Sequence, residues 1–394
     1  MVEIVRSTVL LLVLAAAVFL FACCDDNTGD EADDEPDGDE TGDDTDDDSA
    51  DDDSDDESPP DDDDRRRKLW EMFEEMGFLD YMDFQYTRVE QGPNGYVNYY
   101  FSPEDCRCFD GSEAHVAVSH GTSSNVMLFM EGGGARWPDG GFAVSFDFPF
   151  DMTFKSRAEN NPLKDWNFVY VPHCDNSIHT GDSAIEYNGV LRYHWGARHT
   201  CAAVSLIKQL FPDADKILIS GSSAGGYGTF AGWAILKSQF MDTDTYIVND
   251  SGTGFWNPYD PETWENIKSA WNVPIPDDCT RCRGTLMTYM YEVYMDYDPQ
   301  VRIGMVSSYR DRIISTMFLN MDKLDFQDTL LQVTNDIKSS QPDRFNRFFI
   351  QGDTHTTYEF LLPEGADYEI HGTSLYEWIG QLVNEDPAWS DLLE

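Results

Sequence analysis

The sequence predicts an α/β fold in which helices cover both faces of a mostly parallel sheet. Apolar runs of strand length alternate with segments of helical pattern along residues 69–394. This alternation is the order that parallel strands joined by crossover helices require. The same stretch is long enough to bury one large hydrophobic core. No internal repeat interrupts it, so we expect a single folded domain over 69–394.

Each expected element follows from its own residue pattern. Strands are predicted where apolar residues run without interruption and then stop at Gly, Pro, Asp or Ser, because such runs suit buried parallel strands. Helices are predicted where apolar residues recur with helical spacing, at 69–82, 196–211 and 227–240. The expected strands, in chain order, are 125–130, 167–172, 216–220, 245–249, 301–307 and 344–351.

A glycine-rich turn joins the strand at 216–220 to the helix at 227–240. It reads GSSAG over residues 221–225, which matches the G-x-S-x-G pattern of a nucleophile elbow centred on Ser223. In an elbow the turn is so sharp that small residues must flank a strained serine, whose hydroxyl then projects above the sheet. The pattern alone is weak, because tight turns without chemistry use the same residues.

A second glycine run stands where an oxyanion hole would be needed. The strand at 125–130 leads directly into Glu131 and three glycines. Backbone N–H groups in such a run can face an oxyanion without obstruction by side chains. We therefore expect the N–H groups of Gly133 or Gly134, with that of Ala224 just after the elbow serine, to stabilise negative charge on a substrate oxygen.

The remaining catalytic groups are expected after the last two strands. Asp311 follows the strand at 301–307, and His355 follows the strand at 344–351. An acid and then a histidine, both after the elbow, complete the order that a serine hydrolase of this fold requires. Ser223 would attack, His355 would take its proton, and Asp311 would orient and stabilise the imidazolium.

Asp250 is the alternative to Asp311 as the acid. It ends the strand that follows the elbow helix, a position from which some hydrolases take this residue. The simpler explanations are structural: Asp250 could close an Asx turn, and Asp311 could be a surface acid beside Arg310 and Arg312.

The chain resembles the pectin acetylesterase and Notum family of serine carboxylester hydrolases, which have an α/β-hydrolase-like fold. The resemblance extends over about residues 95–380, and its elbow combined with the glycine run is fairly specific. One departure is that two residues separate the glycines from Trp137, where family members often have the tryptophan at once. The matching stretches are LFMEGGG at 128–134, VYVPHC at 169–174, IHTGD at 178–182, ISGSSAGG at 219–226, NDSG at 249–252 and DTH at 353–355.

The resemblance implies roles for individual residues. It implies Ser223, Asp311 and His355 as the triad, and Gly133, Gly134 and Ala224 as the oxyanion donors. It also implies that Asp250 and Ser251 line the substrate pocket and that His179 shapes its wall. Trp137 is a candidate for stacking on a sugar ring, with ordinary core burial as the alternative. Residues 257–299 are expected as a lid-like insertion over the active site, or as a plain helical connection.

The N-terminus predicts export. Residues 1–22 have a short region holding Arg6 and then an apolar core, as a signal peptide does. The sequence LFAC at 20–23 looks like a bacterial lipobox, so we expect Cys23 to become a lipidated N-terminus. The expected location is the bacterial cell envelope or surface, with attachment to the membrane through the lipid. A plain signal peptide followed by a chance cysteine is the alternative.

An acidic tether is expected between the lipid and the enzyme domain, over residues 23–68. Of the 40 residues at 25–64, 25 are acidic, so the segment repels itself and cannot build a core. The formal net charge of the whole chain is −48. Such a charge disfavours nucleic acids and polyanions as partners, and neutral or acylated carbohydrates suit it better. We expect a monomer.

The cysteine pattern favours disulfides over a metal site. Six cysteines follow the lipobox pair, and an even number in an exported chain suggests three disulfides. We expect Cys174 to pair with Cys201 and Cys279 to close a small loop with Cys282. Cys106 and Cys108 are expected to find different partners. A zinc knuckle at the last pair is disfavoured because no second pair has zinc spacing.

We also expect no metal ion and no cofactor. His173, His179 and Asp182 follow the strand at 167–172 and offer a possible ligand set, but their counterparts in the family shape the pocket wall.

Together these features predict a serine carboxylester hydrolase that removes acetyl groups from an extracellular polysaccharide. The first alternative is removal of a longer acyl group from a protein or lipid, which would need a deep apolar pocket. The second is a catalytically inactive binding module at the cell surface.

Overall fold

The computed structural model describes residues 62–144, 159–282, 284–357 and 368–394, which all lie in one unit, Pro59–Glu394. The expected signal peptide, the lipidation site at Cys23 and most of the tether lie outside these residues. The strands are β1 (Tyr86–Gln91), β2 (Val97–Phe101), β3 (His115–Ser119), β4 (Val126–Met130), β5 (Gly134–Trp137), β6 (Gly140–Ala143), β7 (Asn167–Val171), β8 (Ser183–Tyr187), β9 (Val190–His194), β10 (Lys216–Ser222), β11 (Asp244–Asp250), β12 (Arg302–Ser308), β13 (Phe345–Ile350), β14 (Glu369–Ile370), β15 (Thr373–Ser374) and β16 (Leu392–Leu393). The α-helices are α2 (Asp62–Glu75), α3 (Gly196–Leu210), α4 (Ala224–Gln239), α5 (Pro261–Trp271), α6 (Met290–Tyr297), α7 (Lys323–Ser340) and α8 (Leu375–Val383).

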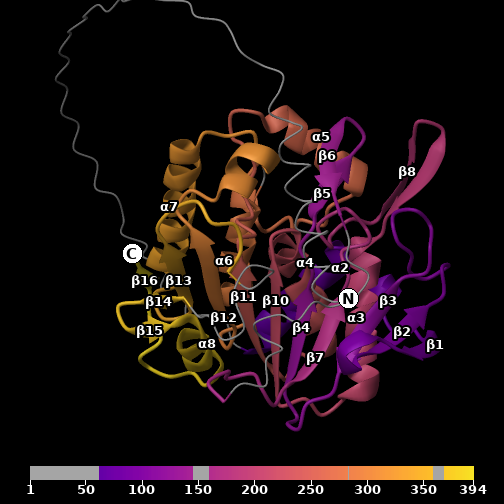
Figure 1. Ribbon diagram of the computed structural model, residues 1–394, viewed down its shortest axis with the longest axis horizontal. Helices are drawn as coiled ribbons and strands as arrows, with labels where there is room; N and C mark the ends of the chain where they lie inside the picture. Colours follow the sequence, from indigo (N-terminus) through magenta and orange to yellow (C-terminus); the bar gives the residue numbers. More distant parts are fainter. Residues whose placement is uncertain (1–61, 145–158, 283, 358–367) are drawn as a thin grey trace, which may run out of the picture. The chain divides into compact units, whose positions relative to one another are not determined.

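The main sheet confirms the predicted fold class. In the described part of the chain it has ten strands in the order β1-β2-β3-β7-β4-β10-β11-β12-β13-β16 (Figure 1). Every pairing from β7 to β16 is parallel, and β1, β2 and β3 form an antiparallel extension at one edge. The strands expected from the sequence are β4, β7, β10, β11, β12 and β13, each within a few residues of its predicted ends.

Hydrophobic residues alternate between the two faces of this sheet, as the period of a strand requires. Leu128 and Ile219 face the larger core, with α2, α3, α4 and α7, whereas Phe129 and Leu218 face a smaller core against α8. Helices therefore cover both faces in the described residues, with most of them on one side. This arrangement buries the central strands completely, which explains why they carry unbroken apolar runs.

The strand order reverses between β4 and β10. From β4 the chain continues outward to β7, and it then returns to add β10 on the other side of β4. Loops leaving two such strands diverge, which opens a crevice at their carboxyl ends. The glycine run at 131–134 follows β4 and Ser223 follows β10, so both predicted features flank this crevice.

Helix α2 starts at Asp62, within the segment that the sequence assigned to the tether. Three aspartates occupy its first turn, where negative charge is favoured by the helix dipole. Arg65 and Arg67 pair with acidic groups three or four residues away. These local interactions extend the helix ahead of Leu69, the first residue that packs on the core.

Residues 257–299 form α5 and α6 and pack through several buried aromatic side chains. Trp264 and Trp271 of α5 are fully buried, and α5 contacts β5, the strand that directly follows the glycine run. The segment is thus helical, and its helix α5 lies beside β5 at the carboxyl edge of the sheet (Figure 1). Within the described ranges, no helix combines the length and the apolar character that crossing a membrane would take.

The predicted pairing of Cys174 with Cys201 is wrong. Cys174 is bonded to Cys108, because the loop that holds Cys108 crosses the end of β7, where the Phe109 N–H donates to the Cys174 carbonyl at 2.7 Å. Cys279 and Cys282 are bonded as expected. Cys106 and Cys201 are buried free thiols, and burial raises the pKa of both.

Disulfide mapping checks this arrangement. Alkylation of the denatured, unreduced chain followed by peptide mass spectrometry should find the Cys108–Cys174 and Cys279–Cys282 crosslinks and should label Cys106 and Cys201 as thiols. A crosslinked peptide joining Cys174 to Cys201 would contradict the structure.

Candidate active site

Ser223 lies at a sharp turn between β10 and α4. Its φ of 56° and ψ of −118° are uncommon for a residue with a side chain, as an elbow requires. The Ser223 N–H donates to the Asp250 carbonyl at 2.8 Å, which holds the turn against the end of β11. The residue is 7% exposed, so little of it reaches the surface.

Two glycines around Ser223 are needed for close packing. A Cβ on Gly225 would lie 2.0 Å from the Met130 carbonyl oxygen, and one on Gly221 would lie 2.3 Å from the Gly225 carbonyl oxygen. Both obstacles are backbone atoms, so they cannot turn aside as a flexible side chain would. These positions therefore explain why glycine stands at both ends of the GSSAG pattern.

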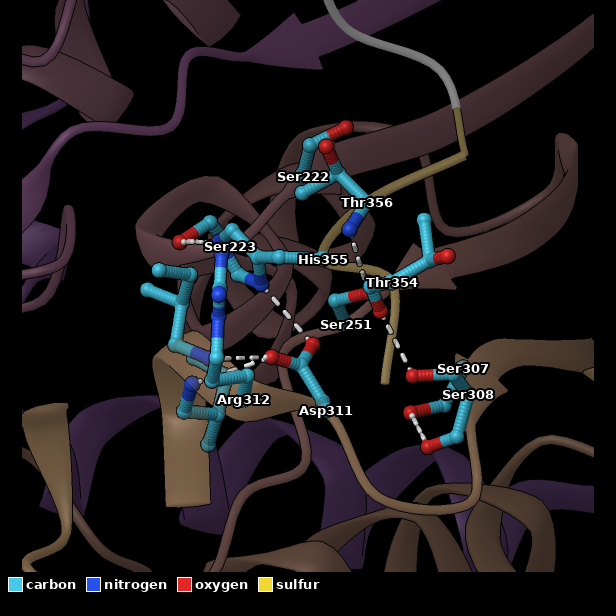
Figure 2. Close-up of polar contacts among 12 residues, drawn as sticks. Ser222, Ser223, Ser251, Ser307, Ser308, Asp311, Arg312, Thr354, His355 and Thr356 are labelled. Atoms are coloured by element: carbon cyan, nitrogen blue, oxygen red, sulfur yellow. Dashed lines mark hydrogen bonds and ion pairs between the residues drawn. The ribbon is translucent and has the colours of Figure 1, made fainter. Parts of the chain in front are cut away.

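His355 lies between Ser223 and Asp311 (Figure 2). Its Nε2 is 2.9 Å from Ser223 Oγ, and its Nδ1 is 2.8 Å from Asp311 Oδ2. A carboxylate can only accept, so Nδ1 carries the proton and Nε2 is left to accept from the serine hydroxyl. The structure thus brings together the three residues that the sequence put forward as a triad.

Asp311 is fixed by its surroundings. It is fully buried, and its second oxygen, Oδ1, accepts the N–H groups of Ile313 and Ile314 at 3.0 Å each, at the start of the π-helix Ile313–Phe318. One oxygen is therefore held by the backbone while the other faces His355. This division leaves the carboxylate little freedom to rotate away from the imidazole.

Asp250 does not take the position of the acid. Its carboxylate accepts from the Thr357 N–H, at 2.9 Å and 3.1 Å, and from the Ser222 hydroxyl at 3.0 Å. Ser251 Oγ donates to the same carboxylate and accepts from the Thr356 N–H at 3.2 Å. Both residues are buried, so the structure does not place them open to a substrate. They instead hold the loop that carries His355.

Another contact on this loop comes from a residue that the sequence did not single out. Ser308, at the end of β12, donates its hydroxyl to the Thr354 carbonyl at 2.5 Å. Its position just before the turn that holds Asp311 was the sequence signal that could have identified it. The loops after β11 and β12 therefore both anchor the loop after β13 (Figure 2).

The glycine run lies beside the elbow. Gly133 and Gly134 are partly exposed, and the start of α4 packs against Met130 and Glu131, the residues just before them. Gly134 has φ near +80°, and a Cβ there would lie 2.2 Å from the Phe142 carbonyl oxygen. Ala224 is the first residue of α4, where backbone N–H groups have no partner within the helix. All three predicted oxyanion residues thus lie at the carboxyl ends of the adjacent strands β4 and β10.

An aromatic cluster adjoins these loops. Trp137, four residues after Gly133, packs edge-on against Trp271 and Phe318, and Phe318 in turn contacts Tyr227 and Trp256. Trp137 and Phe318 are half-buried, whereas Tyr227, Trp256 and Trp271 are buried. The cluster joins the glycine run, the elbow helix, the turn after Asp311 and the 257–299 segment.

His179 lies behind the glycine run and has no exposed surface. Its Nε2 is 2.8 Å from the Glu131 carbonyl oxygen, and burial lowers its pKa to about 4 against the opposing charge of Asp175. Asp182, which the sequence grouped with His173 and His179, pairs instead with Arg198 at 2.6 Å. The acid that faces the two histidines is Asp175, which the sequence did not single out.

Comparison with known families matches residues 145–282 to the family model described as Pectinacetylesterase. The matched segment contains Ser223, Asp250 and the 173–179 cluster. It ends before Asp311 and His355 and begins after the glycine run. The match confirms the resemblance seen in the sequence, and it implies esterase activity of the carbohydrate-esterase type. A comparison with curated proteins gives no match.

Proposed function

We propose that this chain, which matches the pectin acetylesterase family model over residues 145–282, is a serine carboxylester hydrolase. The observation that carries the proposal is the chain of hydrogen bonds from Ser223 Oγ through His355 to Asp311, at 2.9 Å and 2.8 Å. This arrangement can activate a hydroxyl that is otherwise a poor nucleophile at neutral pH.

The proposed reaction begins when Ser223 Oγ attacks the ester carbonyl carbon and His355 Nε2 takes the serine proton. The Asp311 carboxylate stabilises the resulting imidazolium. The carbonyl oxygen becomes an oxyanion, which the N–H groups of Ala224 and of Gly133 or Gly134 can stabilise. When the carbonyl re-forms, the C–O bond to the alcohol breaks, and His355 returns its proton to the departing hydroxyl.

The second half of the reaction releases the acid. Water gives a proton to His355 and attacks the acyl-serine carbonyl, and the second tetrahedral intermediate then expels Ser223 Oγ. The serine recovers its proton from His355, so the enzyme is unchanged and one water has been consumed. For an acetylated sugar the products are acetate and the free hydroxyl.

We propose acetyl groups on an extracellular polysaccharide as the substrate. The family match supports a carbohydrate ester, and the strong negative charge of the chain disfavours polyanionic ligands. Half-buried Trp137 offers a ring face or edge beside the glycine run, a position suited to a sugar. Removal of a longer acyl group from a protein or lipid is the competing proposal, and the aromatic cluster could equally contact an acyl chain.

We also propose that the protein works at the bacterial cell envelope. The support is the sequence of residues 1–23, with its apolar core and lipobox-like end, and the acidic stretch that follows. Lipidation at Cys23 would attach the enzyme domain to a membrane through a long, self-repelling spacer. Such a spacer would let the active site reach polymers at some distance from the lipid.

Replacing the nucleophile tests the reaction. Ser223→Ala should lower turnover of p-nitrophenyl acetate by roughly four orders of magnitude or more, because no other group can form the acyl-enzyme. Turnover would be measured on p-nitrophenyl esters of two to ten carbons and on acetylated pectin and xylan. Acetate esters should be the best substrates.

The matched control is Ser222→Ala, which removes the neighbouring buried hydroxyl but leaves the triad intact. Its turnover should stay within about tenfold of that of the unaltered chain. If Ser223→Ala were equally active, or if the unaltered chain hydrolysed no ester, the proposed serine chemistry would be wrong. A preference for long acyl chains would favour the competing substrate.

Substitution of each buried aspartate in turn distinguishes the proposed triad acid from the residue that anchors the His355 loop. Asp311→Asn should lower kcat by roughly three to four orders of magnitude, because the amide favours the wrong histidine tautomer. Asp250→Asn should lower kcat by no more than about a hundredfold, because the amide oxygen still accepts from the Thr357 N–H or Ser222. Steady-state kinetics on both folded variants decide this, and a deeper loss in Asp250→Asn would reverse the assignment.

Lipidation can be tested in the cell. Bacteria that express the full chain and grow with an alkyne-labelled fatty acid should label it, and Cys23→Ala should abolish the label whereas Cys24→Ala should not. Label retained in Cys23→Ala would place the lipid on another residue. No label in the unaltered chain would refute lipidation.

A further inference from the structure

Three buried side chains outside the triad form a cluster behind the glycine run. One ring nitrogen each of His173 and His179 and one carboxylate oxygen of Asp175 lie within 4.8 Å of one another. All three residues have no exposed surface. They follow β7 closely in sequence, and the strand that leads into the glycine run, β4, pairs with β7.

Within the part of the chain that the structure describes, four polar atoms of this cluster have no hydrogen-bond partner. They are Asp175 Oδ1, His179 Nδ1 and both ring nitrogens of His173. The Val144 carbonyl lies close to His173 beside Gly133, but no hydrogen bond of acceptable geometry joins the two. Buried polar atoms without partners are rare because each costs free energy, so a group of them converging on one point calls for a ligand.

The remaining atoms of two of these residues are already engaged. The Glu131 carbonyl can only accept, so His179 Nε2 must carry the proton that joins them at 2.8 Å, and in a neutral ring Nδ1 has a free lone pair. Asp175 Oδ2 accepts from the Ser177 N–H and hydroxyl, which leaves Oδ1 facing the histidines. His179 Nδ1 and Asp175 Oδ1 are 4.0 Å apart, too far for a hydrogen bond between them.

We propose that His173, Asp175 and His179 bind one divalent transition-metal ion, of which Zn²⁺ is the best representative. Two imidazole nitrogens and one carboxylate oxygen are a ligand set that zinc prefers. The hydrogen bond from His179 Nε2 to a backbone carbonyl is the outer contact by which proteins commonly fix a metal-ligating histidine. A water molecule would complete the coordination.

The distances suit such an ion after a small adjustment. Zinc bonds to nitrogen and oxygen are about 2.0–2.2 Å long, so three atoms within 4.8 Å of one another need to approach a common centre by less than about 1 Å each. Charge also favours a cation. Within the described ranges, no lysine or arginine forms an ion pair with Asp175, and the histidine nearest its Oδ1 is His179, at 4.0 Å.

The ion would stabilise the backbone beside the active site. Glu131 accepts the His173 N–H on its carboxylate at 2.7 Å and the His179 ring N–H on its carbonyl. A Cβ on Gly133 would lie 2.7 Å from His173 Nδ1, so this ring packs directly against the glycine run. The proposed metal is therefore a structural ion, and it does not contact the reacting atoms.

Metal content tests the proposal independently of esterase activity. The full chain, purified from bacteria grown with added Zn²⁺ and dialysed against EDTA, should retain about one zinc per chain by elemental mass spectrometry. EDTA should remove ions held loosely by the acidic segment, whereas a buried site exchanges slowly. Growth with Co²⁺ should yield the visible absorption of tetrahedral cobalt. A chain with less than about 0.1 equivalent of zinc and no cobalt spectrum would overturn the proposal.

Variants locate the ion. His173→Gln and His179→Gln should each lower zinc content at least tenfold. His199→Gln is the matched control, because His199 is equally buried but bonds the His115 carbonyl outside the cluster. It should keep its zinc. Equal zinc in all three variants would refute the assigned site. If the cluster variants fail to fold, the cobalt spectrum of the unaltered chain decides, since the acidic residues 25–64 offer only oxygen ligands.

Discussion

A backbone contact between the start of α4 and the end of β4 determines the geometry of the crevice. Gly225 approaches the Met130 carbonyl so closely that even one methyl group there would lie 2.0 Å from the oxygen. This contact fixes the elbow against the strand from which the glycine run emerges. The nucleophile and its expected N–H donors therefore come from two strands locked together at the point where the strand order reverses, and neither can shift without the other.

The proposed base, His355, is positioned by contacts from two neighbouring strand ends. The loop after β13 carries His355, and the ends of β11 and β12 hold that loop through Asp250, Ser251 and Ser308. Asp311 faces His355 itself. Asp250 and Asp311 thus illustrate two uses of a buried carboxylate. A carboxylate that accepts from backbone N–H groups of a loop orders the loop, whereas one that accepts from an imidazole also stabilises the charge that the imidazole gains.

The sequence predicted what local pattern and chain order determine. Apolar runs located the parallel strands, and the order of glycine run, elbow, acid and histidine selected Ser223, Asp311 and His355. Features that depend on long-range packing were not predictable. The Cys108–Cys174 bond requires the loop before β3 to cross the end of β7, and no local pattern signals that crossing. Likewise Asp175 rather than Asp182 faces the histidines, because an ion pair with Arg198 of α3 turns Asp182 elsewhere.

Two His–Asp pairs at the same edge of the sheet differ in their separation and in their exposure. His355 and Asp311 are joined at 2.8 Å, and the His355 side chain is 19% exposed. His179 and Asp175 are 4.0 Å apart with no exposed surface. That distance is too long for a hydrogen bond that shares a proton. Full burial also keeps the His179 ring from the exchange of protons with solvent that proton transfer needs. A pair separated in this way suits a cation held between the two ligands, which is the role we propose for His179 and Asp175, whereas the close pair suits the proton transfer that we propose for His355.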